Sequence, residues 1–260
     1  KVESILKYPN GIILVTGPTG HGKTTTLYTC LNKLNSNEKK IITIEDPIEY
    51  QMYGINQIQV QPKIGLTFAS GLRSILRQDP DIIMVGEIRD IETAEISIRA
   101  SLTGHLVLST LHTNTSTGAI TRLLDMGIEP YLVSSSVIAV ISERLIRLLC
   151  EKCREKARIQ EIPALKTSEL KSVNIEGKTL YGKGKGCNSC KGTGYSGRTG
   201  IYEVLLIDDE IRRSIIDKQP ENLIREKALS GGLKTLKDDG FKKVLEGVTA
   251  IEEIFRVIGE

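Results

Sequence analysis

The segment from Gly17 to Thr24, GPTGHGKT, matches the phosphate-loop pattern G-x-x-x-x-G-K-[S/T]. It follows the apolar run GIILVT and precedes TTTLYTCLNKL, which is compatible with a helix. Glycines let backbone N–H groups turn toward phosphate oxygens, and the positive end of the following helix faces the same charge. Lys23 is expected on the β- and γ-phosphate oxygens, and the hydroxyl of Thr24 is expected to bind Mg²⁺. We therefore predict a nucleotide site formed by Gly17, Pro18, Thr19, Gly20, His21, Gly22, Lys23, Thr24 and Thr25.

Acidic residues follow two further apolar runs. Glu45, Asp46 and Glu49 lie just past the run IITI, where a proline turn is expected to lift them off the strand, and Glu87 and Arg89 follow DIIMVG. A phosphate loop needs one carboxylate to hold the metal and another to orient or deprotonate water. Ligands of open α/β sheets bind outside the carboxyl ends of strands, so both groups are expected to face the phosphates. A single acid at a strand end is often only a solvated loop charge, but two such groups beside a phosphate loop favour a catalytic role.

One histidine and two arginines are further candidates. His112 follows the run HLVLSTL, where it could sense the γ-phosphate, position water or serve only a structural role. Arg73 and Arg77 are four residues apart on one face of a predicted helix. They form either a solvated face or, in a ring-shaped oligomer, a set of cations that stabilises transferring charge across an interface.

Four cysteines form two C-x-x-C pairs, Cys150 with Cys153 and Cys187 with Cys190, separated by 33 residues. Each pair can supply two ligands of a tetrahedral Zn²⁺ site, and a site with four thiolates is closed, so its role is to fold the segment. Disulfides are the alternative, which a cytoplasmic chain disfavours. Cys30 is expected to be a small buried residue.

The composition indicates an ordinary globular chain. It has 260 residues, of which 40% are hydrophobic, and a net charge of +3. That length can bury one large or two smaller cores, and the small net charge does not demand a polyanionic partner. No apolar run reaches the ~18 residues of a membrane span, and no signal peptide is visible, so we expect a cytoplasmic chain.

The candidate residues need a parallel sheet to position them. Buried strands are predicted at 11–16, 40–45, 81–87 and 105–112, with helical stretches between them, which is the pattern of an α/β fold with a parallel-type sheet. The segment 114–149 is expected to be mostly helical with a break at Gly127 and Pro130, and amphipathic helical spacing returns from Ile201. We expect four parts: a linker at 1–10 from an N-terminal domain that this chain lacks, a nucleotide-binding core at 11–149, a zinc-binding subdomain at 150–195, and a helical C-terminal subdomain at 196–260.

Several of these motifs together resemble one family. GPTGHGKTTTLY looks like its Walker A motif, TIEDPIEY like its aspartate box, LRQDPDIIMVGEIRD like its Walker B motif and TGHLVLSTLHTN like its histidine box; GRTGIYE and the paired C-x-x-C also match. Over almost its whole length the chain resembles the ATPases of type II secretion systems, general secretory pathway protein E. The type IV pilus assembly ATPases are near relatives.

The resemblance implies a RecA-like P-loop core that works as a hexamer. It implies Mg²⁺-dependent hydrolysis of ATP to ADP and phosphate, which drives pseudopilus assembly and protein export. The implied partners are inner-membrane platform proteins, and the implied location is the cytoplasmic face of the bacterial inner membrane. On this analogy Lys23 binds phosphate, Glu49 activates water, Glu87 supports Mg²⁺ and the γ-phosphate, and His112 reports on the γ-phosphate. Candidates for contacts to a neighbouring subunit or to nucleotide are Arg73, Arg77, Arg89 and Arg198.

Three features depart from the family. His21 occupies a loop position that is usually small, and Glu143 stands where the family usually has glutamine. We also expect this chain to lack the family's N-terminal domain, which the resemblance implies supplies arginines to the neighbouring site. We therefore expect the chain alone to bind nucleotide well and to turn over slowly.

Three other functions are compatible with a phosphate loop. A DNA-translocating RecA-like motor would need a basic stripe and stacking aromatic residues, whereas this chain has no Trp and only 4% aromatic residues, so we expect no nucleic-acid partner. A nucleotide switch carrying a cysteine-rich binding module has less need of two acidic groups at strand ends. A type IV pilus assembly ATPase would share every catalytic residue named above, and only its partners would separate it from the secretion ATPase.

Overall fold

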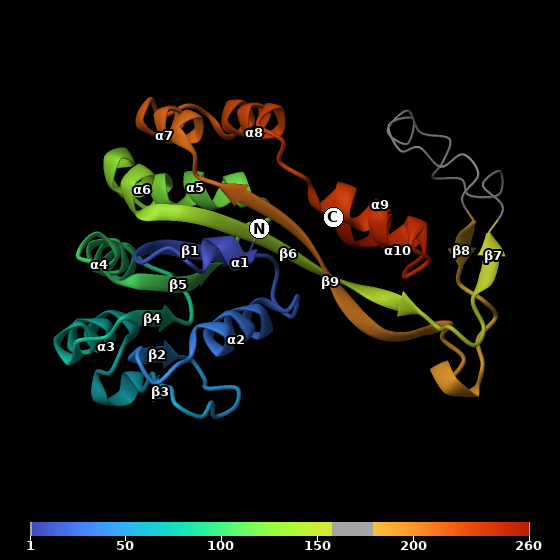
Figure 1. Cartoon of the computed structure of the whole chain (residues 1–260), viewed down its shortest axis with the longest axis horizontal. Helices are drawn as coiled ribbons and strands as arrows, with labels where there is room; N and C mark the ends of the chain where they lie inside the picture. Colours follow the sequence, from blue (N-terminus) through green and yellow to red (C-terminus); the bar gives the residue numbers. More distant parts are fainter. Residues whose placement is uncertain (1, 158–178, 260) are drawn as a thin grey trace. The chain divides into compact units, whose positions relative to one another are not determined.

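The fold is seen in a computed structural model that describes residues 2–157 and 179–259 (Figure 1). It is a mixed α/β fold built on a mostly parallel sheet, as expected. Residues 158–178, part of the predicted zinc-binding segment, lie outside the described residues. Contacts divide the chain into two units, one of 1–142 with 204–233 and the other of 143–203 with 234–260. These units group the chain differently from the four parts expected from the sequence, which remain a prediction.

The central sheet contains the four predicted strands, β1 (Gly11–Thr16), β2 (Ile41–Glu45), β4 (Ile82–Val85) and β5 (Leu106–Leu111). The other strands are β3 (Asn56–Gln59), β6 (Val137–Leu149) and β9 (Tyr195–Leu206), and the order is β3-β2-β4-β5-β1-β6-β9. All neighbouring pairs from β3 to β6 are parallel. The carboxyl ends of β1, β2, β4 and β5 therefore lie along one edge of the sheet.

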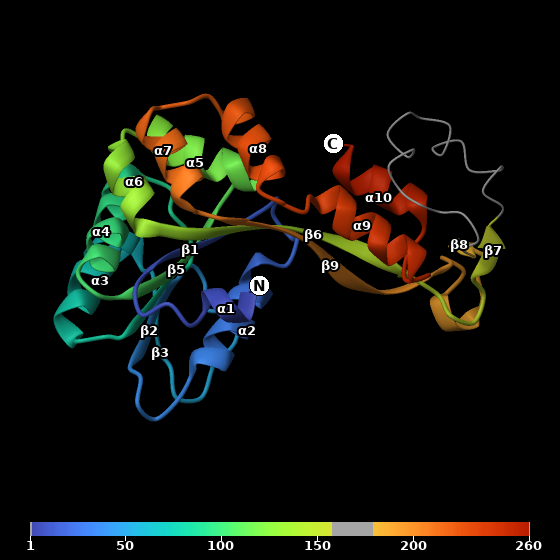
Figure 2. The same ribbon diagram turned by 45° about the horizontal axis from the view of Figure 1, so that its top comes forward.

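Alternating side chains of β1 show how the sheet is covered on both faces. Ile13 and Val15 pack with residues of α1 (Val2–Ile5) and α2 (Lys23–Leu34), whereas Ile12 and Leu14 belong to the core on the opposite face. Because successive strand residues point to opposite faces, an uninterrupted apolar strand requires helices on both. The helices of the second face are α3 (Phe68–Ile75), α4 (Ile91–Leu102), α5 (Ser116–Asp125), α6 (Pro130–Ser136), α7 (Asp209–Ile216) and α8 (Glu221–Ser230), and Figure 2 shows α5, α7 and α8 on the side of the strands away from α2.

The prediction of helix at 137–149 and 201–206 was wrong. Residues 137–149 form β6, which begins directly after α6 at Val137, whose backbone is extended with φ −77° and ψ 124°. β6 pairs in parallel with β1, where Ile13 lies opposite Ala139. A helix here would leave one side of β1 without hydrogen-bond partners, and a buried strand cannot tolerate that. Residues 201–206 are the second half of β9, which neighbours β6 in the sheet.

The second unit has its own small core. The helices α9 (Leu236–Leu245) and α10 (Ile251–Ile258) pack on strand residues such as Ile146 and Ile201. The short strands β7 (Glu155–Ala157) and β8 (Leu180–Gly182) form an antiparallel pair. Short 3-10 helices occur at Pro62–Ile64, Leu76–Gln78 and Asn188–Cys190. Among the described residues, no helix has the length and apolarity needed to cross a bilayer.

Candidate nucleotide site and metal centre

The predicted phosphate loop connects β1 to α2. Gly20 and Gly22 have positive φ angles of 79° and 98°, a region that residues with a Cβ adopt only under strain. Gly22 is the N-cap residue of α2 and contributes no side chain to the first-turn N–H groups, so these donors are available to an anion. The ammonium of Lys23 is buried and donates to the carbonyls of Gly17 at 2.8 Å and Pro18 at 3.0 Å. The loop thus folds around a cation, which suits a bound phosphate.

The predicted acidic and histidine residues follow strands that are close to this loop in the sheet. β5 lies between β1 and β4, and His112 comes directly after β5. Glu87 comes two residues after β4, and this turn is held against β5 by a hydrogen bond from the Ile88 N–H to the Thr110 carbonyl at 3.0 Å. Parallel pairing therefore places the candidate carboxylate and histidine at the edge of the sheet that carries the phosphate loop.

The carboxylate of Glu87 is the centre of a small charged cluster. It accepts from Arg89 Nη2 at 2.5 Å and lies 3.3 Å from His112 Nε2, while its own side chain is only 15% exposed. Burial raises the pKa of Glu87, but the hydrogen bond and charge of Arg89, with His112 beside it, outweigh burial, and the net pKa is lowered. Glu87 is therefore held as a carboxylate, the form that a metal or a positively charged donor requires.

The aspartate-box residues divide into two roles. Glu45, which ends the predicted strand 40–45 but is grouped by the sequence with the acids of the following turn, is the last residue of β2 and is buried, because three polar side chains bind its carboxylate within the fold. Asp46 and Glu49 are exposed. Both of these carboxylates, unlike that of Glu45, therefore lie outside the core.

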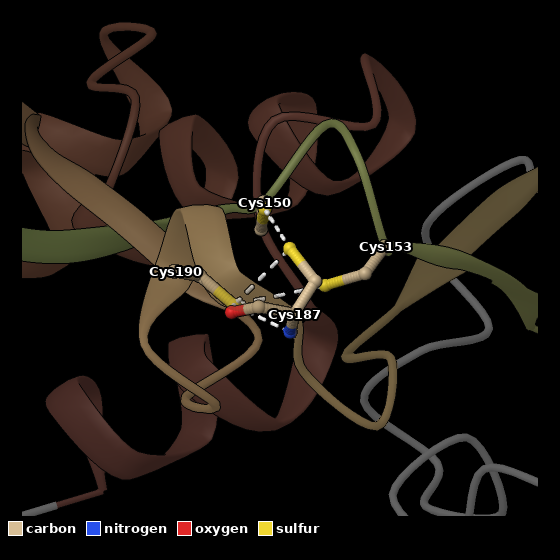
Figure 3. Close-up of side chains that lie close together, drawn as sticks. All are labelled: Cys150, Cys153, Cys187 and Cys190. Carbon is tan, nitrogen blue, oxygen red and sulfur yellow. Dashed lines mark hydrogen bonds between the residues drawn. The ribbon is translucent and has the colours of Figure 1, made fainter.

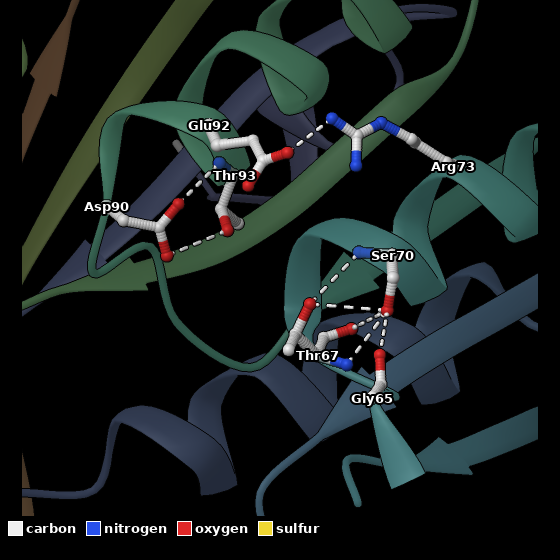
Figure 4. A network of polar contacts seen from close by, with 7 residues as sticks. All are labelled: Gly65, Thr67, Ser70, Arg73, Asp90, Glu92 and Thr93. Atoms are coloured by element: carbon white, nitrogen blue, oxygen red, sulfur yellow. Dashed lines mark hydrogen bonds and ion pairs between the residues drawn. The ribbon is translucent and has the colours of Figure 1, made fainter. Parts of the chain in front are cut away.

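Two of the candidate arginines lie on the exposed side of α3 and the turn that follows it. Figure 4 shows Arg73 pointing to Glu92 in the first turn of α4, where the two form an ion pair with about half of each side chain exposed. The guanidinium of Arg77 donates back to the Arg73 carbonyl at 3.0 Å. The ends of these helices are fixed by side-chain caps, since Thr67 accepts from the Ser70 N–H and Asp90 from the Thr93 N–H. An exposed surface pair of this kind stabilises little, so Arg73 can exchange its partner at low cost.

The four predicted cysteines meet in the second unit, where Figure 3 shows their sulfur atoms together. All four sulfurs lie within 4.8 Å of one another, and those of Cys150 and Cys187, Cys153 and Cys190, and Cys187 and Cys190 are each 3.8 Å apart. Zinc–sulfur bonds of about 2.3 Å at tetrahedral angles put sulfurs about 3.8 Å apart, whereas a disulfide needs about 2.05 Å. The cluster therefore has the dimensions of a tetrahedral zinc site.

Backbone groups also prepare this cluster for a cation. The N–H groups of Cys187 and Gly194 each donate to the Cys190 sulfur at 3.2 Å. These bonds, with that of Cys187 the largest cause, lower the pKa of the Cys190 thiol to about 6. Burial and the neighbouring sulfurs raise the pKa of Cys153. A thiolate packed against three further sulfurs is stabilised by a nearby positive charge, and Zn²⁺ as the occupant would supply that charge.

Tyr28 and Gln57 are not predicted as site residues from the sequence, although both contact the aspartate-box segment. Tyr28 lies on α2 and is fully buried, with its hydroxyl on Glu45. Gln57 lies on β3 and also reaches Glu45, at 3.1 Å. Tyr28 was visible only as the last letter of the phosphate-loop motif, and nothing in the sequence marks Gln57, because its role depends on the pairing of β3 with β2.

The fold and the site together define an α/β protein with a phosphate-loop motif between β1 and α2 and a tetracysteine cluster. The family described as "Type II/IV secretion system protein" matches residues 1–256, and the chain belongs to this family. The resemblance drawn from the sequence motifs is thereby confirmed.

Curated relatives carry both secretion and pilus names. "Type II secretion system protein E" of Pseudomonas aeruginosa is 52% identical over 259 residues, which is 100% of this chain and 51% of that protein. "Type II secretion system ATPase E" of Vibrio cholerae is 52% identical over 98% of this chain and 50% of that protein. "Type IV pilus assembly ATPase PilB" of Thermus thermophilus is 50% identical over 98% of this chain and 28% of that protein. The chain thus spans about half the length of the secretion proteins that it matches.

Solved structures share the fold. The "Pilus Retraction Motor PilT", solved with "Bound ADP", superposes with a TM-score of 0.71 at 30% identity, covering 98% of this chain and 63% of that chain. The Legionella pneumophila "ATPase DotB" superposes with a TM-score of 0.69 at 23% identity, covering 97% of this chain and 61% of that chain, which is a likeness of fold alone.

Proposed function

We propose that this chain is the ATP-hydrolysing part of a type II secretion motor, which converts ATP to ADP and phosphate to drive pseudopilus assembly and protein export. The carrying observation is that Glu87, held by Arg89 and His112, stands at the edge of the sheet that carries the phosphate loop. Support also comes from the type II secretion relatives, which are 52% identical to this chain over 98–100% of its length. A pilus motor of the same fold was solved with ADP.

Each candidate residue has a role in this proposal. Lys23 and the first-turn N–H groups of α2 bind the phosphates of ATP. Glu49, whose side chain is exposed, orients or deprotonates the attacking water. Thr24 and Glu87 would hold Mg²⁺, which would neutralise charge on the phosphate oxygens. His112 contacts Glu87 and so responds to the γ-phosphate end of the site.

The assembly is also part of the proposal. Arg73 and Arg77, both exposed, and Arg89 and Arg198 are candidates to contact nucleotide or a neighbouring subunit in a hexamer of identical chains. Partners would be inner-membrane platform proteins, at the cytoplasmic face of the bacterial inner membrane. The tetracysteine centre would hold Zn²⁺ and stabilise its own unit rather than act on substrate.

ATP turnover per chain, measured against protein concentration with and without duplex DNA, tests the function. The Lys23→Ala variant is the blank, because it lacks the ammonium of the phosphate loop. Turnover that rises with concentration and ignores DNA is expected, since active sites completed between subunits need the oligomer. Turnover that is flat with concentration and stimulated by DNA would instead assign the chain to the DNA-translocating motors. Turnover equal to that of an intact relative would contradict the expectation that this chain alone is slow.

A type IV pilus assembly ATPase is the second candidate, favoured by the match to the Thermus thermophilus pilus protein at 50% identity. Its chemistry at Lys23, Glu49 and Glu87 would be the same, so activity cannot separate the two. Affinity purification of the protein from its own cells separates them: co-purifying pseudopilus-platform proteins support secretion, and pilus-platform proteins overturn it.

A further inference from the structure

The segment that carries Glu49 is tied to the phosphate-loop helix through one buried hydroxyl. We propose that Tyr28, with Glu45 and Gln57, forms a positioning network that sets the backbone of Glu49 relative to α2. The proposal rests on the proposed ATPase function and deepens it by naming residues that act through Glu49 without touching the substrate.

The network is centred on the buried carboxylate of Glu45, which is 2% exposed. It accepts hydrogen bonds from the hydroxyl of Tyr28, from that of Thr43 at 2.6 Å and from the amide of Gln57 at 3.1 Å. Such a carboxylate is costly to bury unless donors surround it, so it holds those donors firmly in place. In the described residues these donors come from three elements, α2, β2 and β3.

Tyr28 connects this centre to the catalytic segment. Its hydroxyl donates to Glu45 and accepts from the backbone N–H of Glu49 at 3.3 Å. Its ring, 1% exposed, meets the ring of Tyr50 edge-on with centroids 4.7 Å apart. Burial, followed by the hydrogen bond to Glu45, raises the pKa of Tyr28, so its hydroxyl keeps the proton that it donates.

Gln57 fixes the rest of the same segment from the other side. Its Nε2 donates to the Tyr50 carbonyl at 3.2 Å, and its Oε1 accepts from the Met52 N–H at 2.7 Å. The amide nitrogen of Gln57 thus donates to Glu45 and to the Tyr50 carbonyl, while its oxygen accepts from Met52. Both polar atoms of the side chain are therefore hydrogen-bonded. Three backbone groups of the segment 49–52 therefore contact this network.

The geometry couples phosphate binding to the position of Glu49. Lys23 begins α2 and Tyr28 lies five residues later on the same helix, so a displacement of the helix N-terminus moves the hydroxyl that holds the Glu49 N–H. A displacement of about 1 Å in a catalytic group is enough to cost about 100-fold in rate. Tyr28 is thus a positioning residue that affects kcat more than nucleotide binding.

The Tyr28→Phe variant tests the proposal, because it removes the hydroxyl and keeps the buried ring. We expect kcat for ATP to fall about tenfold, while the Kd for MgADP stays within twofold of the original protein. The matched control is Tyr53→Phe, the same change in the same stretch of chain at a side chain that is 99% exposed, and it should leave kcat unchanged. A Tyr28→Phe protein with unchanged kcat, or with kcat and affinity reduced equally, would overturn the proposal.

A double-mutant comparison separates positioning from general destabilisation. In a Glu49→Gln background, Tyr28→Phe should cause no further loss of kcat, since its effect passes through Glu49; a full additional tenfold loss would refute the coupling. If Tyr28→Phe does not fold, Gln57→Leu removes the two contacts to the segment and should show the same kcat loss and the same dependence on Glu49, and no loss would again refute it.

The two proposals fail differently in these measurements. A protein whose ATP turnover equals that of Lys23→Ala has no ATPase activity, and the proposed function fails. If Glu49→Gln lowers ATP turnover but Tyr28→Phe and Gln57→Leu do not, the proposed ATPase function stands and the proposed positioning network is refuted.

Discussion

Glu87 and His112, which follow different strands, meet with Glu87 Oε2 3.3 Å from His112 Nε2. The contact exists because β4 and β5 are parallel neighbours, so that the turn after one strand lies beside the turn after the other. A histidine that shares a carboxylate with Arg89 can respond when that carboxylate changes its partner, as it would on binding a metal with ATP.

This relationship predicts that His112→Gln lowers ATP turnover about tenfold, equivalent to about 1.4 kcal/mol of transition-state stabilisation. The chain offers a matched control in His105, which lies before β5 and contacts the Ala100 carbonyl at 2.8 Å. The His105→Gln variant should keep its turnover. Steady-state kinetics of both variants check this, and equal losses in the two would show that His112 has no special place in the site.

A buried carboxylate in the second unit should make folding sensitive to acid. Glu253 has a fully buried side chain that accepts from the Arg147 guanidinium at 2.6 Å and from that of Arg256 at 2.7 Å. Burial raises its pKa, but the two arginines outweigh burial and lower the pKa from 4.5 to about 2. A lowered folded-state pKa stabilises the protein above the unfolded-state pKa, by about 3 kcal/mol here, and this is lost as the pH falls from about 4.5 to about 2.

Urea unfolding of Glu253→Gln tests this expectation. The variant should be about 3 kcal/mol less stable at pH 7, and the difference from the original protein should shrink as the pH falls through this window. Any change at the tetracysteine cluster in acid would affect both proteins alike, so their difference isolates the carboxylate. Glu252→Gln, at the exposed neighbouring position, should change stability little at either pH. A difference for Glu253→Gln that is the same at pH 7 and pH 3 would contradict the assignment.

The tetracysteine cluster predicts about one zinc ion per chain. Replacing Cys187 with serine removes one of four ligands and should reduce zinc to near zero in elemental analysis, with a lower melting temperature. Cys30→Ser is the control, because Cys30 is buried on α2 outside the cluster, and its zinc content should not change. Full zinc content in Cys187→Ser would show that these sulfurs do not form the site.

The N-terminus of α5 should depend on a residue far along the chain. Thr115 caps this helix by accepting from the Gly118 N–H at 3.0 Å, and its hydroxyl donates to Glu221 at 2.6 Å. Thr115→Val should cost about 1 kcal/mol, the usual value of a cap. Glu221→Ala should cost a similar amount, and the double variant less than the sum, because one contact is shared. Urea unfolding measures these costs, and Glu226→Ala, at an exposed position on α8, the helix that also carries Glu221, is the control. Strictly additive costs of Thr115→Val and Glu221→Ala would show that the two side chains are independent.

The strands that carry the candidate site could be predicted because each is a short apolar run bounded by turn residues. The same reasoning was wrong for β6, whose run VIAVISERLIRLL contains apolar residues at spacings that suit a helix as well as a strand. What favours the strand is the unpaired side of β1, which no local pattern reports. The strand position of Glu45 was predicted, but its role in the core was not, because that role depends on hydrogen-bond donors from α2 and β3.

The phosphate-loop motif, the cysteine pairs and the acidic segments after the strands could be recognised from the sequence, because each is a local pattern of neighbouring residues. The three-dimensional fold was needed to show which of those acids face solvent, that Glu87 contacts His112, and that the four sulfurs come within 4.8 Å of one another. These outcomes depend on strand order and on buried hydrogen-bond partners that are distant in the chain. Burial makes an unpartnered polar group costly, and that cost selects one arrangement among the many that the local patterns allow.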